Sequence, residues 1–202
     1  QDSIKESLLT SGAKFQILDS KSTIKKTVEA LEEGKAIGWF QNKMEFGPRA
    51  LGNRSIIFPA TNKHINNIVN KRLNRTEFMP FAPVSIEKFA SKNFKNFKKK
   101  DDLAKFMTVT YDCTKYFINN YPGACHVDNT ARPQILYERD NKWFYDFLNY
   151  YYKKTKQTCI MNTSFNNHEE PIVCTPKDAI KSLINKNVDL IIFNKNILVS
   201  KI

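Results

Sequence analysis

Two arginines and a glutamate lie in the stretch MEFGPRALGNRS, residues 44–55, directly after the apolar run AIGWF. Arg49 and Arg54 carry planar guanidinium groups, each of which can bind a phosphate or a carboxylate through two parallel hydrogen bonds. The two glycines of the stretch permit positive φ angles and a close approach of the backbone to a ligand. The stretch therefore predicts an anion-binding loop, in which Glu45 pairs with one arginine and fixes its plane. The alternative is a tight loop whose arginines bridge local carboxylates.

A second polar stretch, HVDNTARPQ at residues 126–134, contains His126, Asp128, Thr130 and Arg132. A histidine and an aspartate this close can orient each other, and the charge of histidine changes near neutral pH. An arginine nearby can bind an oxyanion. These residue types indicate proton transfer on an anionic substrate. The alternative is a surface histidine without a catalytic role.

A third stretch, NTSFNN at residues 162–167, places Asn162, Ser164 and Asn166 at alternating positions. In an extended chain such side chains project to one side. Amides and hydroxyls are neutral donors and acceptors that can bind a small planar amide or a ribose. Turn formation by an asparagine-rich segment is the alternative.

A fourth group of cations, Lys71, Arg72 and Arg75, lies in NKRLNRTEFMPFAP at the end of an expected helix. Lys71 and Arg75 are four positions apart and share a helix face, where they could bind phosphate. Cations near the C-terminus of a helix are also favourable for the helix itself, and this is the alternative.

Alternating helices and strands must position these four stretches. This alternation predicts an α/β fold, and a final hairpin makes the sheet mixed. Open α/β sheets bind their ligands in loops at strand ends, where three of the stretches fall. Helices are expected at residues 22–35, 61–75, 141–155 and 175–186, and strands at 36–41, 55–60, 81–86, 105–113, from 158, and in a hairpin over 188–202.

Local signals set the expected helix starts. A Ser or Thr opens the first helix, and Thr61 caps the second, whose apolar face includes Ile68. Thr175 and Asp178 form a capping box around a proline at the first helical position of the last helix.

The composition favours a globular protein with an anionic partner. The chain has 202 residues, of which 41% are hydrophobic and 15 are phenylalanine, which is enough to form a core. Its 32 Lys and Arg residues against 20 Asp and Glu give a net charge of +12. Such an excess favours a nucleotide, a phosphate, a nucleic acid or a membrane surface as partner, and a lysine-rich composition bias is the alternative.

The cysteines and the hydropathy indicate a cytoplasmic protein. No pair among the four cysteines has C-x-x-C spacing, so no zinc site is expected and the thiols are expected to be reduced. The sequence also shows no secretory leader and no apolar run of the roughly 20 residues that a membrane helix needs.

Four segments in order, MEFGPRALGNRSI, FMPFAP, HVDNTARPQ and MNTSFN, resemble the C-terminal domain of the NodU/CmcH/TobZ family of carbamoyltransferases. The resemblance implies one domain over residues 1–202 with a YrdC-like fold. This is a twisted sheet of parallel and antiparallel strands, with flanking helices, around a basic cavity. The actin-like, metal-containing N-terminal transferase domain of the family is absent from this chain.

The resemblance also implies an activity. In the family, this domain uses ATP and carbamoyl phosphate to make carbamoyl-adenylate, with release of pyrophosphate. The N-terminal domain, here expected in a separate segment or chain, passes the carbamoyl group to an acceptor hydroxyl. ATP with Mg²⁺ is then a substrate complex, and neither a permanently bound cofactor nor a metal site is expected.

The matching positions assign roles to the candidate residues. YrdC-like domains bind their ligand with K-x-R and S-x-N patterns; Ser164 and Asn166 match the second, while the first has Arg75 but Leu73 at the lysine position. The catalytic candidates are Arg49, His126, Asp128 and Arg132. The substrate- and nucleotide-binding candidates are Arg54, Lys71, Arg72, Arg75, Asn162, Ser164 and Asn166.

Two other functions are compatible with these residues. The run KNFKNFKKK interleaves lysine with phenylalanine, as in a module that stacks nucleic-acid bases, although a solvated lysine run is the more common case. Leu73 keeps open a regulatory domain that binds a nucleotide without turnover.

Overall fold

The computed structural model describes residues 2–75, 80–98 and 102–201, and the chain forms two compact units. Unit 1 comprises residues 1–58, 69–77 and 163–202, and unit 2 comprises residues 59–68 and 78–162. Helix α3 (Ile65–Arg72) begins in unit 2 and ends in unit 1, and strand β8 (Cys159–Ser164) does the same. The sequence-based prediction of one domain over residues 1–202 stays a prediction.

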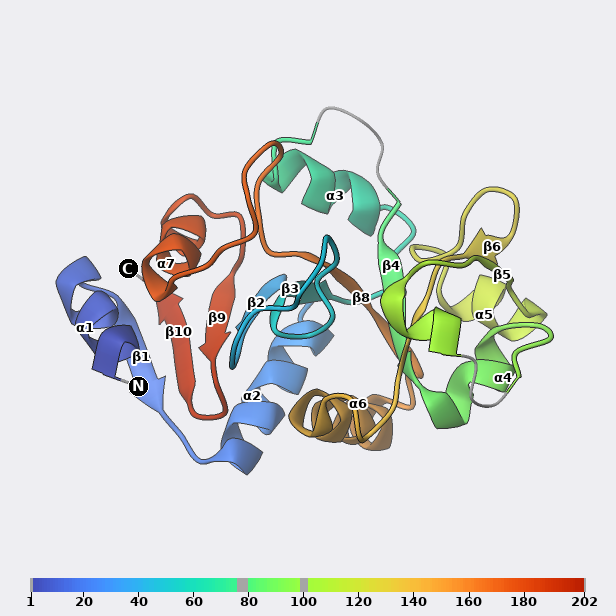
Figure 1. Ribbon diagram of the computed structural model, residues 1–202, viewed down its shortest axis with the longest axis horizontal. Helices are drawn as coiled ribbons and strands as arrows, with labels where there is room; N and C mark the ends of the chain where they lie inside the picture. Colours follow the sequence, from blue (N-terminus) through green and yellow to red (C-terminus); the bar gives the residue numbers. More distant parts are fainter. Residues whose placement is uncertain (1, 76–79, 99–101, 202) are drawn as a thin grey trace. The chain divides into compact units, whose positions relative to one another are not determined.

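Unit 1 contains five strands in the spatial order β1-β10-β9-β2-β3 (Figure 1). Their bounds are Lys14–Ile17 (β1), Ile197–Lys201 (β10), Leu190–Phe193 (β9), Ile37–Phe40 (β2) and Arg54–Phe58 (β3). Neighbours are antiparallel except β2 and β9, which run parallel. Strands β9, β2 and β3 are buried at every position, which places the core of the unit along them. The mixed α/β fold and the terminal hairpin are therefore confirmed.

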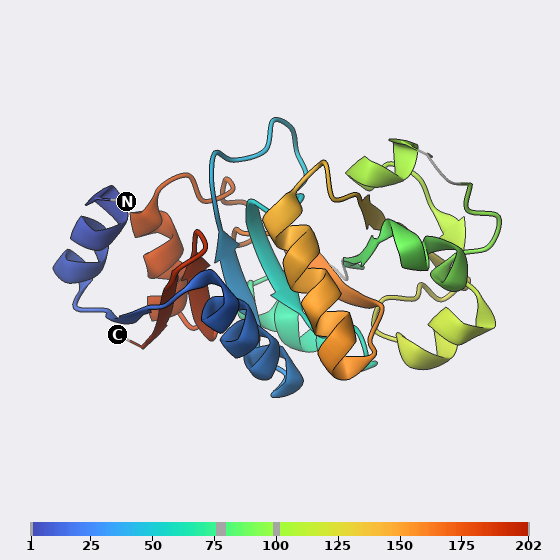
Figure 2. The same cartoon turned by 90° about the horizontal axis from the view of Figure 1, so that it is seen from below.

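Three helices belong wholly to unit 1: α1 (Asp2–Ser11), α2 (Ser20–Glu32) and α7 (Pro176–Ile184). Helix α1 packs beside α7, as Figure 2 also shows, and α7 packs on β9. The predicted capping box of α7 is confirmed, since Thr175 and Asp178 exchange hydrogen bonds with each other's backbone. The predicted Ser or Thr cap of α2 is wrong, because Asp19 accepts the hydrogen bonds from the first turn.

Unit 2 contains β4 (Ala82–Ile86) between β8 and β7 (Gln134–Leu136). Strand β4 is antiparallel to β8 and parallel to β7, and α6 (Lys142–Thr155) packs on it. Trp143, Phe147 and Tyr151 form the buried aromatic face of α6. Between β4 and β7 in the sequence lie a short sheet and small helices: η1 (Glu87–Phe89), α4 (Ala90–Asn93), η2 (Asp102–Phe106), β5 (Tyr111–Asp112), α5 (Lys115–Asn120) and β6 (Thr130–Ala131).

Three expectations from the sequence are wrong in unit 2. The alternating segment 105–113 forms a strand only at β5, because η2 occupies its start up to Phe106 and the next residue, Met107, has a φ of 55°. Helix α3 begins at Ile65 rather than at Thr61, since Asn62 Oδ1 accepts the amide of His64 in a preceding turn. Ile68 is exposed rather than part of the apolar face.

Parts of two segments fall outside the described residues. These are Phe78 and Met79 of FMPFAP, and Lys99 and Lys100 of the lysine–phenylalanine run. Within the described ranges, every helix is too short or too polar to cross a lipid bilayer.

Candidate functional site

The arginine loop between β2 and β3 is held closed from within by Glu45. Glu45 Oε1 accepts hydrogen bonds from the backbone amides of Leu51 and Asn53, both at 2.6 Å. Gly47 and Gly52 have φ angles of 128° and 108°, which other residues rarely adopt. The two glycines therefore serve the turn geometry, as the sequence predicts. The carboxylate contacts backbone amides, and the predicted pairing of Glu45 with an arginine is replaced by this internal tie.

Arg54 ties the base of the same loop. Its Nη1 donates to the carbonyl oxygens of Gln41 (2.7 Å) and Asn53 (3.0 Å), and its Nη2 donates to that of Asn42 (3.0 Å). The side chain is 5% exposed. Burial lowers the pKa of Arg54, and the charge of Glu45 opposes this shift. These contacts give Arg54 a structural task, and direct ligand binding by Arg54 stays a prediction.

Arg49 lies in the outer part of the loop and is exposed. Among the residues that the structure describes, it makes no hydrogen bond or ion pair. Its guanidinium group is therefore available to an anion that approaches the loop.

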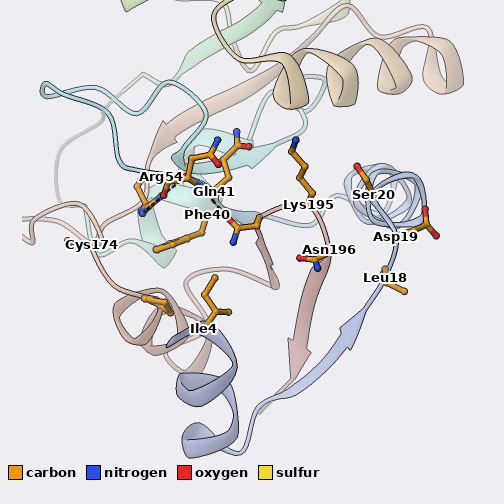
Figure 3. A pocket seen from close by; sticks show the side chains of 13 residues that line it. Ile4, Leu18, Asp19, Ser20, Phe40, Gln41, Arg54, Cys174, Lys195 and Asn196 are labelled. Carbon is orange, nitrogen blue, oxygen red and sulfur yellow. Dashed lines mark hydrogen bonds between the residues drawn. The ribbon is translucent and has the colours of Figure 1, made fainter. Parts of the chain in front are cut away.

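A hollow of about 810 Å³ opens in unit 1 beside the base of the loop (Figure 3). Arg54 and Phe40 form part of its wall, and Lys195 and Asn196 of the β9–β10 turn form another part. Its remaining lining is mostly polar. Of the candidate residues in unit 1, Arg54 lines this hollow, whereas Arg49, Arg75 and Ser164 do not. This hollow therefore does not gather the candidate arginines, as the expected basic cavity would.

The C-terminal end of α3 carries one structural cation and one exposed cation. Arg72 Nη1 donates to Asp189 Oδ2 at 2.7 Å, and the same oxygen accepts the backbone amide of Ala36. Lys71 is exposed. Leu73 has no exposed surface, because it packs in the core of the unit. The position where K-x-R has lysine is therefore a buried, uncharged residue in this chain.

Arg75 and the S-x-N residues each have a partner at or just after the end of β8 in unit 1. Arg75 Nη1 donates to Thr163 Oγ1 at 3.2 Å, and burial lowers the pKa of Arg75. The neighbouring Ser164 Oγ donates to Asn166 Oδ1 at 2.6 Å, and Asn166 Nδ2 donates to the carbonyl of Glu170. A cation, two hydroxyls and an amide thus lie around the end of β8. The sequence predicted three of these groups, and Thr163 was missed although it precedes Ser164 directly.

Asn162 differs from Ser164 and Asn166. It is 1% exposed, and its Nδ2 donates to Oε1 of the buried Gln134 at 2.8 Å. Its amide therefore belongs to the core of unit 2, and ligand binding by Asn162 stays a prediction. Strand β8 ends at Ser164, and the chain turns there. Asn166 therefore lies outside the strand, and strand geometry does not align its side chain with those of Asn162 and Ser164.

The second polar loop, in unit 2, joins its three polar residues through one hydroxyl. Thr130 Oγ1 donates to Asp128 Oδ1 at 2.8 Å and lies 3.1 Å from His126 Nδ1. Its backbone amide also donates to Asp128 Oδ1, at 3.0 Å. His126 and Asp128 were expected to orient each other directly. The structure places the Thr130 hydroxyl between them, and the available signal was a threonine two residues after Asp128 and four residues after His126.

The ionisation of this loop follows from its surroundings. Burial lowers the pKa of His126, Arg132 lowers it further, and Asp128 opposes both effects. The hydrogen bonds from Thr130 lower the pKa of Asp128. At neutral pH the loop therefore holds a neutral imidazole, an ionised carboxylate and a half-buried arginine. Such a set can accept a proton beside a bound anion.

The fold and these loops define a carbamoyltransferase-type domain. The family model described as "Carbamoyltransferase C-terminus" matches residues 28–201, and the chain belongs to this family. The match includes all four sequence stretches considered above.

Curated relatives share this part of the chain. An uncharacterized protein of Methanocaldococcus jannaschii, MJ1051, is 41% identical over 170 residues, which cover 84% of this chain and 32% of that protein. The nodulation protein NolNO of Sinorhizobium fredii is 35% identical over 190 residues, which cover 92% of this chain and 27% of that protein. The chain thus spans about a third or less of these relatives.

Two solved structures have a similar fold. HypF of T. kodakarensis superposes with a TM-score of 0.61 at 16% identity, over 90% of this chain and 23% of that one. A full-length HypF in a phosphate- and nucleotide-bound form gives a TM-score of 0.59 at 18% identity, over 86% and 25%. These likenesses concern the fold.

Proposed function

We propose that the chain is the carbamoyl-activating domain of an O-carbamoyltransferase. It would bind ATP and carbamoyl phosphate and form carbamoyl-adenylate. A separate domain or chain would transfer the carbamoyl group to an acceptor hydroxyl. Membership of the carbamoyltransferase C-terminal family over residues 28–201 is the observation that carries the proposal. The phosphate- and nucleotide-bound HypF of similar fold supports it.

The reaction would need cations where negative charge develops. Hydrolysis of carbamoyl phosphate would first give carbamate and inorganic phosphate, with water supplying the oxygen. A carbamate oxygen would then attack the α-phosphorus of ATP, the oxygen–phosphorus bond to pyrophosphate would break, and pyrophosphate would leave with the bonding electrons. Guanidinium groups fixed in advance, together with the Mg²⁺ carried by ATP, would stabilise this charge. Arg49 is exposed and Arg75 is held at Thr163, so these two arginines are the first phosphate-binding candidates to test in unit 1.

The neutral groups would recognise the smaller part of the substrate. Ser164 and Asn166 hold each other in place and could bind the planar carbamoyl group. In unit 2, Arg132 would bind an oxyanion, and His126 would accept a proton during the breakdown of carbamoyl phosphate. Lys71 remains a further candidate for phosphate because it is exposed.

The test is exchange of labelled pyrophosphate into ATP by the 202-residue chain, with and without carbamoyl phosphate. Exchange that requires carbamoyl phosphate supports the proposal. Arg132→Ala should lower this exchange by a factor of about 10²–10³, the usual effect of removing one oxyanion donor. Arg139→Ala is the matched control, because Arg139 is an exposed arginine outside the candidate site. If Arg132→Ala and Arg139→Ala show the same rate of pyrophosphate exchange, the role of Arg132 is refuted.

One observation favours a second function, a regulatory domain that binds a nucleotide without turnover. A fully buried leucine, Leu73, stands where the K-x-R pattern has a lysine, so this position offers no charge to a ligand. Saturable ATP binding in calorimetry, without any exchange dependent on carbamoyl phosphate, would support this second function and contradict the first.

A further inference from the structure

We infer that Thr130 is a positioning residue that fixes the tautomer of His126, with the proton on Nδ1 and the lone pair on Nε2. The catalytic use of this tautomer rests on the proposed function, whereas the tautomer itself does not. The inference starts from one hydroxyl that contacts a carboxylate oxygen and an imidazole nitrogen. Thr130 Oγ1 lies 2.8 Å from Asp128 Oδ1 and 3.1 Å from His126 Nδ1.

The number of protons decides the direction of both hydrogen bonds. A threonine hydroxyl has one proton to donate and lone pairs that accept. An ionised carboxylate can only accept, and hydrogen bonds from Thr130 lower the pKa of Asp128, so the carboxyl is ionised at neutral pH. Thr130 therefore donates its proton to Asp128. The remaining contact, to His126 Nδ1, is possible only if Nδ1 carries a proton and donates it to Thr130.

The backbone holds these side chains in place. The amide of His126 donates to the carbonyl of Thr130 at 2.8 Å, and the amide of Asn129 donates to the carbonyl of His126 at 3.0 Å. Asn129 has a φ of 62°, a conformation that asparagine tolerates better than most residues. Its carbonyl accepts the amide of Cys113 at 2.8 Å, which anchors the loop next to β5. The relay His126–Thr130–Asp128 is therefore built into a closed turn.

The charges around the imidazole suit a proton acceptor. Asp128 favours the charged form of His126, and Arg132 opposes it. On β5, Asp112 lies opposite Thr130 in register, and the thiols of Cys113 and Cys125 stay protonated because burial raises their pKa. The net effect lowers the pKa of His126, so the imidazole is neutral near pH 7. Nε2 then offers its lone pair to a substrate proton.

The tautomer can be measured without any activity. Two-bond ¹H–¹⁵N correlation spectra distinguish a protonated Nδ1 from a protonated Nε2, and His126→Gln assigns the signal among the three histidines of the chain. In the wild type at pH 8, we expect Nδ1 to be protonated. A spectrum dominated by the Nε2–H tautomer would overturn the inference.

Two variants change the relay from opposite ends. Thr130→Val removes the acceptor of the Nδ1–H group, and Asp128→Ala frees the Thr130 hydroxyl to donate to Nδ1. Both are expected to shift His126 toward the Nε2–H tautomer, whereas Thr130→Ser is expected to keep the wild-type pattern. Thr108→Val is the control, because it removes an exposed hydroxyl that donates to the carbonyl of Leu103 outside the loop. If neither Thr130→Val nor Asp128→Ala changes the spectrum, the inference is refuted.

The catalytic consequence needs the exchange assay. Thr130→Val should lower pyrophosphate exchange at least tenfold, and the acidic limb of its pH–rate profile should move relative to wild type, since this limb reports the imidazole. Thr130→Ser should restore most of the rate. Equal losses in Thr130→Val and Thr130→Ser, with unchanged pH profiles, would refute the positioning role. An absence of exchange in the wild type would refute the proposed function, and the spectra would still decide the tautomer.

Discussion

The guanidinium carbon of Arg54 lies 3.5 Å from the centroid of the Phe40 ring. The cation thus covers the last residue of β2 while its nitrogen atoms bind the carbonyl groups that follow this strand. A stacked guanidinium and an aromatic ring attract each other, and the attraction increases when water is excluded. One side chain therefore ties the two ends of the arginine loop to the sheet.

Replacement of Arg54 should destabilise the protein. In Arg54→Met, the carbonyls of Gln41 and Asn42 lose a charged donor, and such hydrogen bonds contribute about 1.5–3 kcal/mol each. We expect a loss of about 3 kcal/mol in the free energy of unfolding, measured by urea denaturation. Arg54→Lys should recover little, because lysine lacks the planar fork. Arg49→Met, at an exposed arginine of the same loop, is the control, and an equal loss in both Met variants would contradict the assignment.

Gly38 should not tolerate a side chain. A Cβ atom at this position would lie 2.5 Å from Phe165 Cζ and 3.2 Å from Ile191 Cγ1. Phe165, between Ser164 and Asn166, is fully buried, so its ring must move to make room for the added carbon. We expect Gly38→Ala to cost about 1–3 kcal/mol, as overpacking usually does. The double variant Gly38→Ala/Phe165→Leu should recover part of the lost stability, measured by thermal denaturation. If the double variant is no more stable than Gly38→Ala, the clash is not with Phe165.

A lysine at position 73, as in the K-x-R pattern, should destabilise the protein. Leu73 is completely buried, so Leu73→Lys would place an ammonium group in the core of unit 1. An uncompensated buried charge costs on the order of 3–5 kcal/mol. Urea denaturation should show this loss, whereas Leu73→Met should cost less than about 1.5 kcal/mol because it conserves volume. A stable Leu73→Lys variant with increased ATP affinity would show instead that this position can face the ligand.

Acid should weaken the protein partly through His126. Burial holds the pKa of His126 in the folded state below the ordinary value of 6.5. Between that lowered pKa and 6.5, the unfolded chain binds more protons, so the free energy of unfolding falls as the pH falls below about 6.5. His126→Gln lacks this contribution. Denaturation midpoints at pH 7.5 and 5.5 should therefore differ less in the variant than in the wild type; an equal difference would contradict the pKa shift.

The four thiols should react at different rates. Cys174 is exposed, whereas burial raises the pKa of Cys113, Cys125 and Cys159. A disulfide reagent attacks through the thiolate, so one thiol should react quickly in the native protein and the others only after unfolding. Cys174→Ser should abolish the fast phase. If the fast phase survives this substitution, one of the other cysteines is accessible.

Local sequence signals predicted most of the elements and part of the site. Thr175, Pro176 and Asp178 specify the start of α7 by themselves, because capping depends on neighbouring residues. The strand predicted over residues 105–113 was wrong, because this stretch of alternating apolar and polar residues begins with the end of η2 and continues with Met107, which has a positive φ. Periodicity cannot distinguish these cases when a segment is short.

The order of the amino acids was enough to identify the residue types at the strand ends and, through four ordered stretches, the carbamoyltransferase C-terminal family. The glycines that the arginine loop requires were also identified in this way. The use of each polar group depended on the folded chain: Arg54 binds the backbone of its own loop, Asn162 pairs with Gln134, and Arg72 pairs with Asp189. The physical reason is that a polar side chain binds whatever partner the fold brings near it, and those partners lie up to 117 residues away along the chain.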